Sequence, residues 1–434
     1  MNISRKEIIP GIWLSCLRTD KFKSNCLSVS LLTQLNKETI SKNALITRVL
    51  SRGTTMHPDM ESLAAALDEL YGAKIIPNVR KKGEILCLGF YSGFIDDRFT
   101  PDKSQLLESV AALIGEMLLS PVTRGGLLNK DYVESEKEKL IDDIRAQIND
   151  KRGYSMHRLI QEMCVYEDYA IDDMGSEDGA SNVGYIELTH YYKELLSKSP
   201  IEIFYCGSAD PKRVEAALAE ALMALPRGEI DYEIGTDIRM NPVEDEPRFF
   251  TEQLAVAQGK LVMGFRLGEA MEEPDFAALR VLNCIFGGGV TSKLFMNVRE
   301  KLSLCYYASS AIDRLKGVMI VSSGIEFDKV DVVREEILKN LDDVKDGNFT
   351  EDELASAKSS VVSDLVSLLD SPSALEEFYL SQTLMGLEYG PEELADLCRQ
   401  VTSGDVIKAA KTIELDAVYF LRGNGEEENS DADF

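Results

Sequence analysis

The stretch 276-FAALRVLNCIFGGGVTSKLF-295 sets the pattern from which the fold can be worked out. It contains an apolar helical run, a break of three glycines and the start of a second helix. That second helix is expected to turn four apolar residues inward: Leu294, Phe295, Val298 and Leu302. Before the stretch, apolar residues alternate as in a β-strand: Leu261, Met263, Phe265 and Leu267. The order is therefore strand, helix, glycine break, helix.

The first half of the chain repeats this order. A half-buried strand is expected where Leu27, Val29 and Leu31 alternate with Ser28 and Ser30. A helical run over 44–50, a Gly-Thr break and a helix that starts near residue 60 follow. A duplicated unit of this kind predicts two homologous domains.

Each half continues with two strands about a turn of Lys and Gly, Lys82-Gly83 in the first and Lys316-Gly317 in the second. Two helical stretches then follow in each half, at 104–119 and 132–148 and at 330–344 and 351–369. Hairpin-like strand pairs favour an antiparallel sheet. The predicted fold class is α+β, with two homologous domains, each a mainly antiparallel sheet with helices packed on one face.

Length and composition agree with two domains. The chain has 434 residues, which exceeds the roughly 250–300 at which single cores stop growing. A hydrophobic content of 44% is that of a packed globular protein. We expect an N-terminal domain over 1–225, a linker of Pro, Gly and acidic residues over 226–247, a C-terminal domain over 248–424 and an acidic tail over 425–434.

The charge of the chain disfavours some partners. Lys and Arg number 47 against 74 Asp and Glu, and the net charge of −27 would repel phosphate backbones and anionic lipid headgroups. Neither nucleic acid nor a membrane is expected as a partner. The N-terminus shows no signal-peptide core, and the eight cysteines form no CxxC pair. We expect buried thiols in a cytoplasmic protein.

The histidines do not indicate a metal site. His57, His157 and His190 all lack a second histidine at the spacing that places two ligands on one helix face. No serine lies in a G-x-S-x-G elbow. The glycine break is not a phosphate-binding loop, because Ser292 stands where that loop needs a glycine. Thr291 or Ser292 is expected to cap the helix that follows.

The segment 44-ALITRVLSRGT-54 resembles the signature of the pitrilysin, insulinase and mitochondrial processing peptidase family. In these inverzincin metallopeptidases, His-x-x-Glu-His is followed by a hydrophobic stretch and Gly-Thr. When the segment is aligned on its Gly-Thr pair, the three signature positions are Ala44, Thr47 and Arg48. None can serve as a zinc ligand or as the general base. A methyl group has no lone pair, threonine is a poor base and an arginine cation opposes a zinc ion.

The family also places two acidic residues seven apart on a helix, the second being the third zinc ligand. Glu136 and Asp143 fit these positions, and seven residues make two turns, so both face the same way. Without the histidines, a solvated acidic face is the simpler interpretation. The resemblance therefore implies a degenerate member that holds no cofactor itself.

The second half keeps more of the family's pattern. The glycines Gly287, Gly288 and Gly289, followed by Arg299 and Tyr306, look like its C-terminal domain. There the glycine loop can approach substrate or another chain closely, and an Arg and a Tyr seven residues apart reach the substrate carbonyl. A guanidinium and a phenol can both donate to a forming oxyanion. Because Tyr307 adjoins Tyr306, a shift of one residue stays open.

The resemblance implies a non-zinc-binding subunit of a two-chain peptidase, inactive alone, like the inactive partner in bacterial pairs. Zinc is expected in a homologous partner subunit, and an extended peptide is the expected substrate. Arg299 and Tyr306 would then assist the partner's zinc site. An alternative is a catalytically inert peptide-binding or scaffold protein on the same fold. A third, an independent hydrolase, is disfavoured by the poor inventory of nucleophiles and metal ligands.

Overall fold

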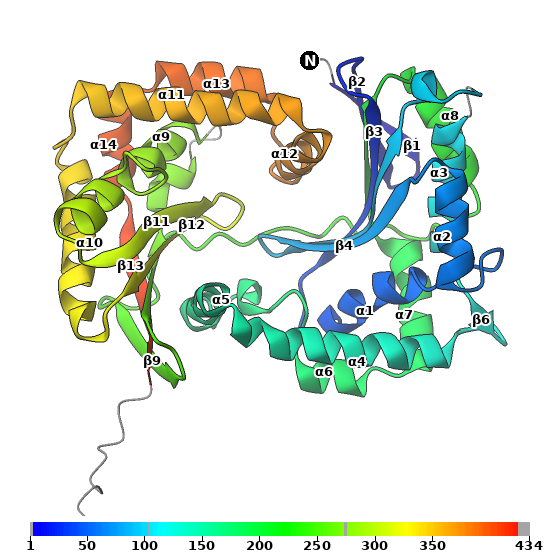
Figure 1. Ribbon diagram of the computed structural model, residues 1–434, viewed down its shortest axis with the longest axis horizontal. Coiled ribbons are helices and arrows are strands. Elements are labelled where there is room, and N and C mark those ends of the chain that lie inside the picture. The colour runs from blue at the N-terminus through cyan, green and yellow to red at the C-terminus, as the bar shows by residue number, and fades with distance from the viewer. Residues whose placement is uncertain (1–2, 103–104, 273–275, 424–434) are drawn as a thin grey trace, which may run out of the picture. The chain divides into compact units, whose positions relative to one another are not determined.

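The computed structural model describes residues 3–102, 105–272 and 276–423, which form two compact units (Figure 1). The first unit holds the described residues of Met1–Arg145, Ile171–Thr236 and Leu368–Gly390. The second holds those of Ala146–Ala170, Asp237–Ser367 and Pro391–Phe434. Each half of the chain thus contributes one segment to the unit formed mainly by the other half. The acidic tail expected over 425–434 lies outside the described residues.

The first unit is built on a six-stranded sheet in the order β1-β2-β8-β3-β5-β4. Its strands are β1 (Ile3–Ile9), β2 (Ile12–Arg18), β8 (Ile201–Gly207), β3 (Ser24–Gln34), β5 (Ile85–Ile95) and β4 (Lys74–Lys82). Only β2 and β8 pair in parallel among these strands. A separate hairpin joins β6 (Thr123–Arg124) to β7 (Leu127–Leu128).

The second unit has a five-stranded sheet in the order β9-β13-β10-β12-β11. Its strands are β9 (Arg248–Leu254), β13 (Glu414–Gly423), β10 (Gly259–Arg266), β12 (Val318–Ile325) and β11 (Cys305–Asp313). Again one pair, β9 with β13, is parallel and the other pairs are antiparallel. The order and the place of the parallel pair match β2-β8-β3-β5-β4 of the first unit, which confirms the predicted α+β fold of two homologous halves.

Most helices of each unit come from the same half of the chain as the sheet of that unit. In the first unit these are α1 (Ile40–Leu50), α2 (Met60–Glu69), α3 (Leu106–Leu119), α4 (Lys130–Ala146), α6 (Glu177–Asn182), α7 (Tyr185–Lys198) and α8 (Pro211–Leu222). In the second they are α9 (Ala277–Phe286), η5 (Leu294–Lys301), α10 (Val330–Lys345), α11 (Glu351–Ser367), α13 (Pro391–Gln400) and α14 (Ser403–Lys411). No helix within the described ranges is long and apolar enough to cross a membrane.

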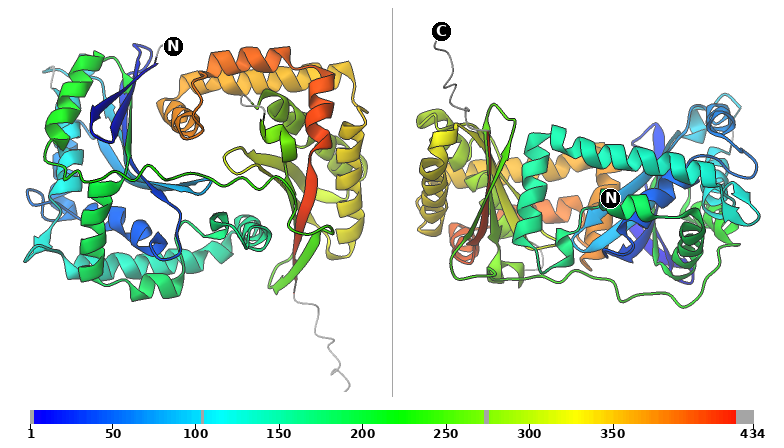
Figure 2. Two further views of the ribbon diagram at one scale, coloured as in Figure 1. Left: turned by 180° about the vertical axis from the view of Figure 1, so that it is seen from behind. Right: turned by 90° about the horizontal axis from the view of Figure 1, so that it is seen from below.

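The other face of the first sheet is covered by α12 (Pro372–Leu384), which comes from the second half of the chain (Figures 1 and 2). This helix makes β3 buried on both faces, so the expectation of a half-buried strand there was wrong. Ser28 and Ser30 are 2% and 5% exposed. The Ser28 hydroxyl donates to Glu376 Oε1 of α12 over 2.9 Å. Glu376 is held in turn by Arg80 of β4 through two hydrogen bonds of 2.7 Å.

The second sheet is covered in the same way by α5 (Lys151–Met163), which comes from the first half (Figure 2). Leu159 and Met163 pack on Val262 of β10 and on neighbouring strand residues. Gly264 permits this close approach, because a Cβ atom there would collide with the Met163 sulfur. The burial of both sheet faces therefore depends on one helix exchanged in each direction.

A buried network of charges ties the segment after α5 to the second sheet. Arg266 is fully buried and donates to Glu167 Oε1 over 2.6 Å and to Asp416 Oδ2 over 2.8 Å. Lys316 Nζ lies 2.7 Å from Glu167 Oε2, and Arg248 donates to Asp416 Oδ1 over 2.6 Å. Each buried carboxylate thus faces two cations, as buried charges require.

This network predicts a loss of stability in acid. Burial alone would raise the pKa of the Glu167 carboxyl, but hydrogen bonds from Arg266 and Lys316 outweigh burial and hold it below the ordinary value of 4.5. The folded state therefore gains stability from ionised Glu167 above that value and loses it as the pH falls through the lowered pKa. We expect Glu167→Gln to lower Tm at neutral pH, with the gap to the wild type closing in acid. A pH-independent gap, in calorimetry, would count against this role.

Candidate functional site

The signature positions of the first half lie on α1. Ala44 and Thr47 are 4% and 3% exposed, and Ala44 belongs to the apolar core of the first unit. Ser51 Oγ donates to the Thr47 carbonyl over 2.8 Å, a local contact that closes the end of the helix. Two of the three positions are therefore packing residues that offer no ligand nitrogen or carboxylate.

The third position, Arg48, faces the acidic helix α4. Its guanidinium donates to Asp143 Oδ2 over 2.7 Å, with side-chain exposures of 28% and 54%. Four residues further on, just past the end of α1, Arg52 donates to Glu136 Oε1 over 3.1 Å, and Glu136 is almost buried. The structure thus brings the signature helix and both acidic positions together. The solvated face expected for Glu136 was wrong, because Arg52 and the i+3 residue Lys139 cover it.

These side chains do not suit a zinc ion. Arg48 places a cation against the carboxylate that would be the third ligand, and Ala44 has no donor atom. No group of three or more His, Cys, Asp or Glu among the described residues could hold a metal. His157 and His190 are exposed, and His57 Nε2 lies 4.0 Å from Glu116.

This misfit leads to a prediction about metal removal. The isolated chain should contain no stoichiometric zinc, because the α1–α4 positions are filled by an ion pair. EDTA should leave its Tm unchanged. Elemental analysis and a thermal scan with and without chelator would check both points, and one zinc per chain would contradict them.

The glycine loop follows α9 in the second unit. The N–H groups of Gly287 and Gly288 donate to the Asn283 carbonyl over 2.9 Å and 2.7 Å, and Ser310 N–H of β11 donates to Gly287 O over 3.0 Å. A Cβ atom at Gly287 would meet Ser310 Oγ at 2.6 Å, so no side chain fits there. A Cβ atom at Gly289 would meet nothing within 4 Å. The loop is therefore anchored at its start and open at its end.

The helix after this loop carries Arg299. Ser292 Oγ accepts from Phe295 N–H over 3.4 Å, whereas the residue at the N-cap of the π-helical segment is Lys293, whose side chain forms no cap. The helix is of the π type, with Leu302 N–H donating to Asn297 O, five residues back. Leu294 and Val298 are buried as expected, but Leu302 is 44% exposed because it lies beyond the last helical residue.

Arg299 lies with its guanidinium carbon 4.6 Å from the Phe295 ring centre. Its only ion pair with a described residue is the long contact of 3.6 Å to the adjacent Glu300. The side chain is 41% exposed. The guanidinium group contacts the aromatic ring, while its N–H groups are available to hydrogen-bond another molecule.

Tyr306 sits in a β-bulge at the start of β11. Cys305 pairs with Ile325 and Tyr307 with Gly324, so Tyr306 is an extra residue, and it is 62% exposed. Bulges re-aim side chains and are common beside active sites. Burial raises the pKa of the Cys305 thiol, and the charge of Arg299 opposes that rise. The bulge therefore leaves Tyr306 exposed.

Tyr307 is held inside the second unit. Ser322 Oγ lies 3.5 Å from its hydroxyl, and the Arg152 guanidinium carbon lies 4.5 Å from its ring centre. Arg152 also donates to Ser309 over 3.0 Å, and Lys260 Nζ lies 5.7 Å from the same ring. This basic cluster was missed in the sequence, because Arg152 comes from α5 of the other half and no local motif marks it.

The fold and these positions define a class: a two-domain protein on a metallopeptidase scaffold whose zinc-binding positions are replaced. Residues 182–361 match the family described as "Peptidase M16 inactive domain". The "Probable inactive metalloprotease YmfF" of Bacillus subtilis (strain 168) is 34% identical over 415 residues, covering 95% of this chain and 96% of that protein. The chain belongs to the peptidase M16 family, which confirms the predicted resemblance.

Other bacterial relatives agree. A conserved protein from Enterococcus faecalis V583 has a crystal structure with a TM-score of 0.88 and 28% identity, covering 99% of this chain and all of that one. The "Uncharacterized zinc protease YmxG" of Bacillus subtilis (strain 168) is 30% identical over 138 residues, 30% of this chain and 33% of that protein. Bacillus subtilis thus carries one relative named as an inactive metalloprotease and another named as a zinc protease.

Proposed function

We propose that this chain is the zinc-free subunit of a two-chain peptidase. A homologous zinc-bearing subunit cleaves the peptide, and this chain supplies substrate-binding and carbonyl-polarising groups. The observation that carries the proposal is an asymmetry: Arg48 and Asp143 form an ion pair at the zinc positions, whereas Arg299 and Tyr306 are exposed. Both exposed donors stand at the seven-residue spacing that the resemblance assigns to the pair reaching the substrate carbonyl.

The roles of these residues follow from their chemistry. In the first half, the signature positions stabilise the unit and leave zinc to the partner. In the second, Arg299 and Tyr306 donate to the oxygen of the scissile carbonyl as it gains negative charge. The open end of the glycine loop at Gly289 allows a peptide or the partner to approach the backbone closely.

The compartment we propose is the cytoplasm. All eight cysteines are free thiols, and seven of them are buried. Free buried thiols suit a reducing compartment. The net charge of −27 adds no affinity for nucleic acid or anionic membranes.

The test is assembly followed by cleavage. This chain would be mixed with the homologous chain of the same genome that bears an intact His-x-x-Glu-His, and the complex isolated by size exclusion with light scattering. We expect a 1:1 complex that cleaves a peptide library, with products identified by mass spectrometry. A complex that forms but never cleaves would favour the inert scaffold, and absence of any complex would contradict the two-chain proposal.

A further inference from the structure

The basic cluster around Tyr307 places two cations at one aromatic ring of the second unit. The Arg152 guanidinium carbon lies 4.5 Å from the centre of the Tyr307 ring, and Lys260 Nζ lies 5.7 Å from it. The two charges therefore lie within about 10 Å of each other, the distance over which salt screens charges. Arg152 comes from α5, Lys260 from β10 and Tyr307 from β11. Three segments distant in sequence thus meet at one ring.

The register of the sheet fixes this arrangement. Tyr307 and Lys260 both pair with Gly324 of β12, so these three residues form one row across the strands and share a face. Gly324 leaves room for the ring, because a Cβ atom there would lie 2.5 Å from Tyr307 Cε1. Arg152 is held over the same face, since it donates to Ser309 Oγ over 3.0 Å. Both cations are therefore positioned without the help of a ligand.

Among the described residues, neither of these two cations forms an ion pair with a carboxylate. Lys260 donates to Gln258 Oε1, which is the oxygen of a neutral amide. The carboxylate nearest to Arg152 in the sequence is that of Asp150. It accepts from the backbone N–H groups of Arg152 and Gly153 and so serves as the cap of α5. The two positive charges are thus left without a counter-charge.

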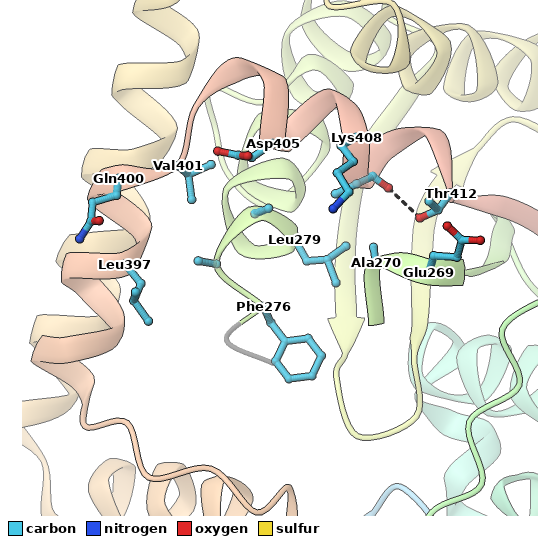
Figure 3. Close-up of a pocket in the computed structure, with 13 residues that line it drawn as sticks. Glu269, Ala270, Phe276, Leu279, Leu397, Gln400, Val401, Asp405, Lys408 and Thr412 are labelled. Atoms are coloured by element: carbon cyan, nitrogen blue, oxygen red, sulfur yellow. Dashed lines mark hydrogen bonds between the residues drawn. The ribbon is translucent and has the colours of Figure 1, made fainter. Parts of the chain in front are cut away.

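Other cations of the second unit do have acidic neighbours. Lys408, for example, shares the lining of a cavity of about 350 Å³ with Glu269 and Asp405 (Figure 3). Carboxylates outnumber cations in this chain by 74 to 47, so composition does not explain a pair of cations without one. Burial and, after it, the charge of Arg152 lower the pKa of Lys260. A bound anion would remove this repulsion.

We propose that Arg152 and Lys260 bind a carboxylate of the peptide substrate, namely an Asp or Glu side chain close to the scissile bond. Such a subsite presupposes the proposed function and adds the class of substrate to it, acidic peptides. Tyr307 directly follows Tyr306, the proposed donor to the scissile carbonyl, so the cluster lies one residue along β11 from the reaction. A guanidinium and an ammonium group both form charge-assisted hydrogen bonds with carboxylate oxygens. The ring of Tyr307 positions the cations, and the cations hold the carboxylate.

The test uses the complex of this chain with its zinc-bearing homologue. Pairs of C-terminally amidated peptides would differ only in Glu or Gln at one position, which is moved along the residues beside the scissile bond. We expect Glu at one such position to raise kcat/KM about tenfold over Gln. Arg152→Met/Lys260→Met should bring this ratio close to one. Lys339→Met/Arg399→Met removes the same charge from exposed ion pairs of the second unit and should keep the ratio.

Because the ratio compares two peptides on one enzyme, a partial loss of folded protein cancels. If the double variant does not assemble, Lys260→Gln alone should lower the ratio. An unchanged ratio in a complex that cleaves would overturn the subsite and leave the proposed function standing.

Peptide binding to the full chain alone separates the subsite from the division of catalysis. Fluorescence anisotropy of the same peptides, labelled, should show tighter binding of Glu than of Gln, and Arg152→Met/Lys260→Met should lose this preference. If the complex cleaves nothing but this preference is found, the proposed function fails and the carboxylate site stands. Equal affinities of the two peptides would overturn the site. A preference for a free C-terminal carboxylate over Glu would overturn the side-chain assignment in favour of the end of the peptide.

Discussion

Cleavage by the two-chain enzyme is expected to fall by about 100-fold in kcat when Tyr306 is changed to Phe or Arg299 to Ala. Each change removes one donor to the oxyanion of the transition state and leaves the fold intact, because both side chains are exposed. An interaction made only in the transition state lowers kcat and kcat/KM equally, with little change in KM. Steady-state kinetics on a fluorogenic peptide would measure this.

The matched control is Tyr307→Phe. Tyr307 neighbours Tyr306 but packs against Arg152 and Ser322 within its own unit, so its hydroxyl should matter little to the reaction. If Tyr307→Phe lowers kcat and Tyr306→Phe does not, the register of the Arg–Tyr pair is off by one residue. Full activity in the variant that lacks both Arg299 and Tyr306 donors would refute their catalytic role.

The largest effect on stability is expected from Arg266→Met. This guanidinium is fully buried between Glu167 and Asp416, and its loss leaves each carboxylate with one cation fewer in a dry environment. Breaking a buried ion pair by removing one partner costs about 3–5 kcal/mol. Urea denaturation of the full chain, followed by circular dichroism, would show the midpoint shift.

Arg399→Met is the control for this change as well. Arg399 pairs with Asp396 on α13, and both side chains are more than half exposed, so we expect a cost below about 1 kcal/mol. Equal costs for the two arginines would mean that burial of the network contributes nothing. A stabilised Arg266→Met variant would mean that the desolvation of these charges outweighs their pairing.

The fold could be predicted because its repeat is local. Alternation in β3 and β10, the helices that follow and the turns at Gly83 and Gly317 all depend on residues close in sequence. Both glycines have positive φ, 58° and 72°, as the turns require. The exchanged helices α5 and α12 could not be predicted, since neither carries a signal for the sheet on which it packs. That is why Ser28, which looks solvent-facing, is buried against Glu376.

The candidate site, like the fold, could be predicted from the sequence only in part. Motif spacing identified Arg48 and Asp143 as related positions, and the structure joins them in an ion pair. The bulge that exposes Tyr306 arises from pairing with β12, which spacing along one strand does not reveal. Arg152 reaches Tyr307 only because α5 crosses to the other unit. Contacts between residues distant in sequence thus decided what the motifs left open.

The central claim is that catalysis is divided between two chains, and an activity titration tests it most directly. The zinc-bearing homologue would be held at a fixed concentration and this chain added stepwise while peptide cleavage is followed. The rate should be near zero without this chain, rise in proportion to it and level off at one equivalent. A zinc-bearing chain that cleaves at full rate alone, unchanged by any amount of this chain, would contradict the account.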